Sequence, residues 1–513
     1  MKRFALVSVM LVAFVAAGIA TSPRAQAGLF GGGKAASPSP SPSPSAIPTA
    51  SPEPPDVAIP RLQAKLKANP NDQQAMTDLA TEFLQVSRPD LAVQLTQHLI
   101  QMGDKTAQVY YIDGYAMQQL GKQDAAIDDL ENAATVDPSN MGVLRELADL
   151  YLRANRFTDA ERIANRAIKL NPTDEAAYET LGSVQAAEQK YDDARLTFEK
   201  AASMDPKNAG PLVQIASTYA AQDNIPIALQ SIDRALALDP KDVQTLVFKA
   251  DLYAKEHDDA RASAAYDDAI VASTSDDEKA GIMIRKAQYY ASEKKFSLAE
   301  ATFQQAIAQY PKQDSLYTSF GDYWINQKNL NNAVTEYQAA LAINKSDASA
   351  LARLGQIAMQ SGKMNDAVTY LKQLVAVAPD PQAFAMLGQA YSYLHDYASS
   401  KDACGKSFQL QREPGTLACI GGADYELKNY KEAAQIFDIL DANAHGFLDQ
   451  NPQFLYVAAK CYQQTNQKPK ALAAYKRLLP MMKKGTKDYS EVTQAIATLS
   501  KPAHAPAKAP AHG

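Results

Sequence analysis

Apolar and polar residues in the middle of the chain recur with a period of 34 residues. Three consecutive segments, which begin at Met141, Glu175 and Ala209, align with one another without a gap. Each contains two stretches of about a dozen residues in which apolar side chains are spaced three and four apart, as on one face of an α-helix. A fixed period of this length indicates a repeat protein whose repeats are pairs of amphipathic helices.

Four positions of the repeat carry the same kind of residue in all three segments. Small residues at positions 8, 20 and 27 would let the paired helices approach closely, and larger residues at positions 11 and 24 would fill the spaces between them. Proline at position 32 ends the second helix, because it lacks an N–H group and restricts the residue before it. In order of position, these residues are Ala148, Gly182 and Ala216; Ala160, Ala194 and Ala228; Ala167, Ala201 and Ala235; and Pro172, Pro206 and Pro240.

This period and signature resemble those of the tetratricopeptide repeat family. The resemblance implies an all-α, right-handed superhelical solenoid in which each repeat contacts only its neighbours and the first helices line a concave face. We count about twelve helix-turn-helix repeats from Gln73 to Gly485, followed by a capping helix at about Lys487 to Leu499. About three extra residues, Asp277 to Lys279, follow the sixth repeat. In the second repeat, Asp113 occupies a usually apolar position and therefore needs a partner or exposure.

The first 27 residues have the features of a signal peptide. A basic start precedes the apolar run Phe4 to Ala20, and Ala25-Gln26-Ala27 is a small-x-small cleavage site, so we expect the mature chain to begin at Gly28. The alternative is an uncleaved membrane anchor, for which an apolar run of seventeen residues is short. We therefore expect export to the periplasm, the cell envelope or the outside of the cell, with no transmembrane span in the mature chain.

The segments on either side of the repeats have a composition typical of disorder. Residues 28–60 are rich in proline and serine and predict an extended linker, although a helix should begin near Asp56 and reach Pro70. The solenoid with its cap is expected over residues 61–500. The Ala/Pro-rich residues 501–513 are expected to form a disordered tail.

Charge and motifs exclude several classes of function. With 51 Lys and Arg against 57 Asp and Glu, the chain is mildly acidic and lacks a basic block, which argues against nucleic acid as the main partner. Gly28 to Lys34 resembles a phosphate-binding loop, but Ala35 stands where a Ser or Thr would hold magnesium. We find no catalytic residues, no metal site and no cofactor site. Since no segment of domain size remains unassigned, we do not expect an enzyme.

Two of the three cysteines fall in neighbouring repeats. Cys404 is predicted on the second helix of one repeat and Cys419, fifteen residues later, on the first helix of the next. In an oxidising compartment they could form a disulfide that contributes about 3 kcal/mol. The alternative, which we favour from sequence, is two separate small core residues. Cys461 is left over in either case.

The resemblance implies that positions 2, 5, 9, 12 and 13 of each first helix line the concave face. On this face, aromatic residues beside arginine are typical of binding hot spots, whereas the alternative is that each residue is merely solvated. Arg145 is accompanied by Asp149 rather than by the Asn of relatives that grip a C-terminal carboxylate, so we do not expect that mode of recognition. The predicted partner-binding residues are Tyr111, Tyr115, Arg145, Asp149, Arg153, Phe248, Asp251, Gln288, Asp322 and Gln356.

Taken together, the sequence predicts an exported, non-enzymatic scaffold that binds a peptide or a partner protein on its concave face. The alternative is a regulatory or assembly subunit of an envelope complex for polysaccharide synthesis or export, or for secretion. Neither the partner nor the oligomeric state can be predicted from the residues.

Overall fold

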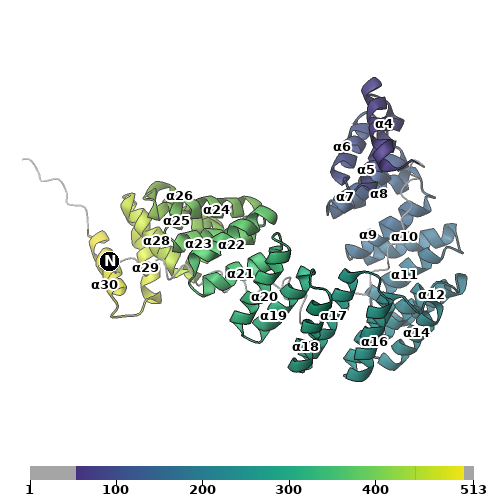
Figure 1. Cartoon of the computed structure of the whole chain (residues 1–513). Helices are drawn as coiled ribbons and strands as arrows, with labels where there is room; N and C mark the ends of the chain where they lie inside the picture. Colours follow the sequence, from purple (N-terminus) through teal and green to yellow (C-terminus); the bar gives the residue numbers. More distant parts are fainter. Residues whose placement is uncertain (1–52, 445, 502–513) are drawn as a thin grey trace, which may run out of the picture. The chain divides into compact units, whose positions relative to one another are not determined.

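The computed structural model describes residues 53–444 and 446–501, and these form helices and connecting turns without a strand. Contacts divide them into two compact units, residues 53–282 and residues 283–501, with the division inside helix α17 (Asp276–Ser292). Figure 1 follows the helices by colour along the chain. The predicted all-α solenoid of helix pairs is confirmed.

The first unit begins with a single helix, and helix pairs of similar length follow it. The single helix is α4 (Pro55–Ala68). The pairs are α5 (Gln73–Gln85) and α6 (Pro89–Gln101), α7 (Ala107–Gln119) and α8 (Gln123–Val136), α9 (Met141–Arg153) and α10 (Phe157–Leu170), α11 (Glu175–Ala187) and α12 (Tyr191–Met204), α13 (Gly210–Ala221) and α14 (Ile225–Leu238), and α15 (Val243–Lys255) and α16 (Asp259–Ala272).

The second unit continues the same pattern from within α17. Its helices are α18 (Phe296–Gln309), α19 (Asp314–Asn326) and α20 (Leu330–Ile343), α21 (Ala348–Gln360) and α22 (Met364–Val377), α23 (Pro381–Tyr393) and α24 (Tyr397–Leu410), α25 (Pro414–Glu426) and α26 (Tyr430–Asn443), the short α27 (Phe447–Gln450), α28 (Pro452–Gln464) and α29 (Lys468–Leu478), the 3₁₀ turn η1 (Leu479–Met481), and α30 (Lys487–Leu499). With α17 paired to α18, the described residues contain the twelve predicted helix pairs.

Close packing within each pair explains the small residue at position 8. A Cβ atom on Gly182 would lie 2.6 Å from the ring of Phe198, which is at position 24 of the same repeat. Gly321 faces Tyr337 in the same way, also at 2.6 Å. Since Phe198 and Tyr337 are fully buried, their rings occupy the space that a larger residue at position 8 would need.

The turn between the two helices of a pair has the same backbone conformation in every repeat. Position 15 has a positive φ in all twelve pairs, and only two of these residues, Gly121 and Gly362, are glycine. The other ten are Ser87, Asn155, Gln189, Asp223, His257, Lys294, Lys328, His395, Lys428 and Asn466. An L-residue in this left-handed region costs about 1–2 kcal/mol, so most repeats keep a strained turn.

Side chains cap many of the first helices. Asn140 accepts a hydrogen bond from the Val143 amide at 3.2 Å, and Asp347 accepts one from the Ala350 amide at 3.0 Å. Such caps satisfy amide groups that the helix itself leaves unpaired. They therefore fix where each repeat begins.

Three segments outside the regular helix pairs complete the fold. α4 begins at Pro55, next to the predicted helix start near Asp56, so residues 55–60 of the predicted linker are helical. The extra residues Asp277 to Lys279 lie in the first turn of α17. The short helix α27 occupies the longer connection between α26 and α28, where no helix was predicted. The capping helix α30 has the predicted bounds.

Several predictions concern residues outside the described ranges. The signal peptide at residues 1–27, most of the linker and the tail beyond Lys501 lie there. Within the part of the chain that the structure describes, no helix has the length and apolar character needed to cross a bilayer.

Candidate functional site

Tyr111 is the most buried of the predicted partner-binding residues. Its side chain on α7 is only 6% exposed, and its hydroxyl group has no hydrogen-bond partner within the described residues. Burial, with a smaller contribution from the charge of Glu146, raises the pKa of Tyr111 to about 12. The hydroxyl therefore remains protonated at neutral pH, and it is a donor whose hydrogen-bonding capacity is unused.

Arg145 and Asp149, on α9, are half-buried, and Arg153 is exposed. Arg153 forms an ion pair with Asp149 at 2.7 Å, one turn apart on the same helix. The Nε of Arg145 donates to the backbone oxygen of Met141 at 3.3 Å, but the guanidinium forms no ion pair with a described residue. Arg145 also influences the pKa of Tyr111 electrostatically. The Arg145 cation and the Tyr111 hydroxyl, which lie on first helices of the same unit, therefore interact electrostatically.

Two of the predicted partner-binding residues bond to tyrosines of their own repeats. Asp251 accepts a hydrogen bond from the hydroxyl of Tyr266 at 2.7 Å. Asp322 accepts one from Tyr337, also at 2.7 Å, and pairs with Arg353 at 3.0 Å. Both tyrosines are buried at position 24. These carboxylates therefore already satisfy buried hydroxyls, which is a structural role that the sequence prediction missed.

The remaining four predicted residues, Tyr115, Phe248, Gln288 and Gln356, are half-buried. Tyr115 packs against the core of the first repeats, and Phe248 against the core formed by α13 to α15. Gln288, Asp322 and Gln356 belong to unit 283–501, whereas the other predicted residues belong to unit 53–282. The candidate grouping is Tyr111, Tyr115, Arg145 and Asp149 on α7 and α9, in which Tyr111 interacts electrostatically with Tyr115 and Arg145.

Three carboxyl groups of the same unit, Asp113, Asp129 and Glu179, have raised pKa values, and burial is the largest cause for each. Asp113 is 2% exposed and accepts a hydrogen bond from the hydroxyl of Thr96 at 2.6 Å, so it has the partner that its position requires. Burial, together with the charge of Asp113 and a hydrogen bond to it, raises the pKa of Asp129 to about 7. Glu179 on α11 likewise has a pKa raised to about 7, by burial and then by the charge of Glu175. Like charges that share a buried site favour a neutral partner.

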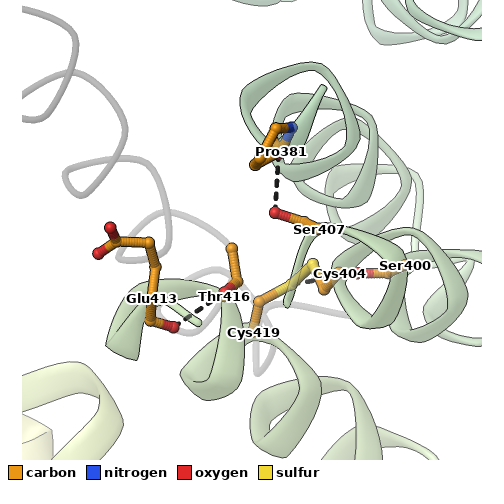
Figure 2. The surroundings of a disulfide bond; sticks show 7 residues. All are labelled: Pro381, Ser400, Cys404, Ser407, Glu413, Thr416 and Cys419. Carbon is orange, nitrogen blue, oxygen red and sulfur yellow. Dashed lines mark hydrogen bonds between the residues drawn. A yellow bond between two sulfur atoms is a disulfide. The ribbon is translucent and has the colours of Figure 1, made fainter. Parts of the chain in front are cut away.

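Cys404 and Cys419 are joined by a disulfide, with Cα atoms 6.2 Å apart (Figure 2). The interpretation favoured from sequence, two separate core residues, is therefore wrong. The bond connects α24 to α25. The Ser400 hydroxyl lies 3.8 Å from the sulfur of Cys419, and Ser407 donates to the backbone oxygen of Pro381 at 2.7 Å. The remaining cysteine, Cys461, is buried, and burial raises its pKa to about 12.

A pocket of about 390 Å³ lies among α22, α23 and α24. Small side chains on α24, Ala398 and Ser399, leave space over Phe384 and Tyr391 of α23. Lys372 and Lys406 are exposed at the same pocket. Most of this lining comes from second helices and from α23 positions outside the predicted face. The pocket was not predicted from sequence. The only sequence feature that indicates it is a pair of small residues at positions 18 and 19 of this repeat.

Family models confirm the resemblance that the repeat signature indicated. A model described as "Tetratricopeptide repeat" matches residues 118–183, 185–250 and 325–390, and a second model with the same description matches residues 284–349. Residues 118–183, 185–250 and 284–390 therefore consist of tetratricopeptide repeats. No curated protein matches it.

Solved structures of other repeat proteins overlap parts of the chain. The crystal structure of MamA is 24% identical, covers 30% of this chain and 90% of its own, and has a TM-score of 0.29. YrrB, titled "a TPR protein with an unusual peptide-binding site", is 22% identical, covers 36% of this chain and 95% of its own, and has a TM-score of 0.32. The C-terminal part of a repeat protein from Cytophaga hutchinsonii is 18% identical, covers 42% of this chain and 90% of its own, and has a TM-score of 0.35.

Proposed function

We propose that this protein is an exported, non-enzymatic scaffold that binds a peptide or a partner protein along the first helices of unit 53–282. Its tetratricopeptide repeats support a role in protein–protein interaction. The specific contact surface is the group formed by Tyr111, Tyr115, Arg145 and Asp149 on α7 and α9.

The observation that carries this proposal is the unused hydrogen-bonding capacity of that group. Among the described residues, the buried hydroxyl of Tyr111 has no hydrogen-bond partner, and the guanidinium of Arg145 has no ion pair. An unpaired buried polar group costs about 1–3 kcal/mol. A bound peptide supplies backbone carbonyl groups and carboxylates, which both side chains can bind, so binding would recover part of this cost.

Export is the second part of the proposal. The predicted signal peptide supports it, and so does the disulfide between Cys404 and Cys419, because such bonds persist in oxidising compartments and are rare in the cytosol. The role of a regulatory or assembly subunit in an envelope complex is compatible with the same surface. The identity of the captured partner would distinguish the two.

The test is a crosslinking pull-down from the native host. The double variant Tyr111→Phe/Arg145→Gln removes the hydroxyl and the cation with little change in shape, and it should lose the partner that the wild type captures. A matched control, Tyr191→Phe/Arg162→Gln, makes the same changes on second helices of the same unit and should retain it. Equal capture by all three proteins would contradict the proposed surface.

A further inference from the structure

The end of unit 283–501 contains a long segment without a single acidic residue. Residues 450–487 include eight Lys and Arg and no Asp or Glu. Three of the eight are paired with acids from outside the segment: Lys460 with Glu491, Lys470 with Asp438 and Arg477 with Asp441 and Asp449. Five lysines therefore remain without an ion pair to a described residue.

Four of these five lysines lie in one short stretch, residues 476–487, which we call the basic loop. It comprises the end of α29, the turn η1 and the connection to the first residue of α30. The exposed lysines of the basic loop are Lys476, Lys483, Lys484 and Lys487. The sequence analysis missed this concentration of charge because the chain as a whole is acidic.

Local bonds hold the basic loop in one conformation. Thr486 donates from its hydroxyl to the backbone oxygen of Lys483 at 2.9 Å, and its side chain caps α30 through the amide of Tyr489. Gly485 adopts a φ of 82°, which favours glycine. Leu479 and Met482 pack against the adjacent core. The basic loop, at the yellow end of the chain in Figure 1, is thus a folded turn that carries four exposed lysines.

An apolar side chain lies exposed among these lysines. Met481 is 43% exposed, and the neighbouring Pro480 is exposed as well. A site for an acidic polypeptide needs positive charge alone and does not require an exposed methionine beside the lysines. A lipid surface uses both, because anionic headgroups attract the lysines while the apolar side chain enters the boundary between headgroups and acyl chains.

We propose that the basic loop docks this protein on the surface of a membrane that contains anionic phospholipids. The lysines bind the headgroup phosphates, and Met481 inserts between them. This contact goes beyond partner binding on α7 and α9, which lie in the other unit. The charge of the unit that carries the loop supports it, since the described residues 283–501 have 24 Lys and Arg against 19 Asp and Glu, which is complementary to an anionic surface.

The test is co-sedimentation of the protein with vesicles. It uses the chain from Gly28 onward, because the apolar run before Gly28 could itself bind lipid. Vesicles of phosphatidylcholine alone are compared with equal mixtures of phosphatidylcholine and phosphatidylglycerol. The wild type should bind only the mixed vesicles, and added salt should release it. Lys483→Gln/Lys484→Gln should weaken binding about fivefold for each lysine, and Met481→Ser should weaken it a few-fold.

The control variant Lys345→Gln/Lys431→Gln removes two exposed lysines elsewhere in the same unit and should bind like the wild type. Far-UV circular dichroism checks that each variant is folded. The proposal is overturned if the wild type ignores the mixed vesicles or if the control loses binding equally. It is also overturned if soluble polyglutamate competes fully while Met481→Ser has no effect, because the loop would then be a site for acidic polypeptides.

Discussion

The two units of this protein are built from the same repeat but differ in charge and in how they are stabilised. Unit 53–282, with 22 Lys and Arg against 38 Asp and Glu, has a formal charge of −16, and the described residues 283–501, with 24 Lys and Arg against 19 Asp and Glu, have a charge of +5. The two carboxyl groups whose pKa reaches about 7 lie in the first unit, and the disulfide lies in the second. The repeat signature thus specifies the helix pairs, but it does not specify their net charge, their titratable groups or their crosslinks.

One tryptophan makes the two units separately observable. Trp324 is the only tryptophan in the chain, and it packs in unit 283–501 beside Phe320 and Tyr323. Its fluorescence in urea therefore reports the unfolding of that unit, whereas far-UV circular dichroism reports both units. The experiments below combine these two signals.

The largest expected effect comes from breaking the disulfide. Cys404→Ala/Cys419→Ala should lower the free energy of unfolding of unit 283–501 by about 3 kcal/mol, because the bond closes a loop of fifteen residues. The fluorescence transition should move to lower urea, while the part of the dichroism transition that belongs to the first unit stays in place. A reductant should destabilise the wild type but not the variant. A shift of the whole dichroism curve would instead mean that the two units unfold together.

Overpacking at position 8 should be more costly in the second unit than in the first. Gly321→Ala drives a methyl group into Tyr337, whose hydroxyl is tied to Asp322, whereas Gly182→Ala meets Phe198, which has no such bond. We expect Gly321→Ala to destabilise its unit by about 1–3 kcal/mol, partly offset by the better helix propensity of alanine. Gly182→Ala should be milder. Equal urea midpoint shifts would show that the tyrosine–aspartate bond does not restrain the ring.

The pH dependence of stability should be stronger in unit 53–282. Its fold raises the pKa of Asp129 from 3.8 to about 7, so between these values the folded state binds more protons than the unfolded state. Stability should therefore fall as the pH rises from about 4 to 7. The full shift corresponds to about 4 kcal/mol, which partial solvent screening reduces to on the order of 1 kcal/mol at this site. Asp129→Asn should remove this loss and stabilise the unit at pH 8. If the variant is no more stable than the wild type there, the fold does not raise the pKa of Asp129.

The smallest effect should be the same in both units. Gln189→Gly and Lys328→Gly place glycine at left-handed turn positions, with φ of 65° and 59°. Relief of backbone strain outweighs the extra entropy of the unfolded chain only slightly, so each change should stabilise its unit by less than about 1 kcal/mol. Asn155→Gly is the control, because asparagine already tolerates this conformation and should gain less. Destabilisation by either glycine would show that the native side chain has contacts worth more than the strain.

Much of the fold could be predicted from sequence because the repeat period fixes it. The starts of α5 at Gln73, α9 at Met141 and α23 at Pro381, and both ends of α30, agree with the alignment. The helix α27 was not predicted, because it lies in a connection that no repeat position governs. The family comparison confirmed the kind of repeat that the signature indicated, but it gave no information on a partner.

The candidate surface was harder to predict than the fold. A repeat position indicates which face of a helix a residue occupies, but it does not indicate whether the side chain already bonds to a neighbouring residue. Asp251 and Asp322 were predicted to bind a partner, yet each holds a tyrosine fifteen residues later. Aspartate at position 9 with tyrosine at position 24 would have been the signal. The burial of the Tyr111 side chain depends on neighbouring helices, so it could not be inferred from the sequence of its own repeat.

The bond between α24 and α25 has a mechanical consequence. In each unit the helices contact mainly the next one or two along the chain, so a force applied to the ends would peel helices away in sequence. At Cys404 the load would pass through the sulfur atoms directly to Cys419, and residues 405–418 would carry none of it. A chain pulled from either end would lengthen less than its residue number predicts, and its extension would reveal whether the crosslink had survived.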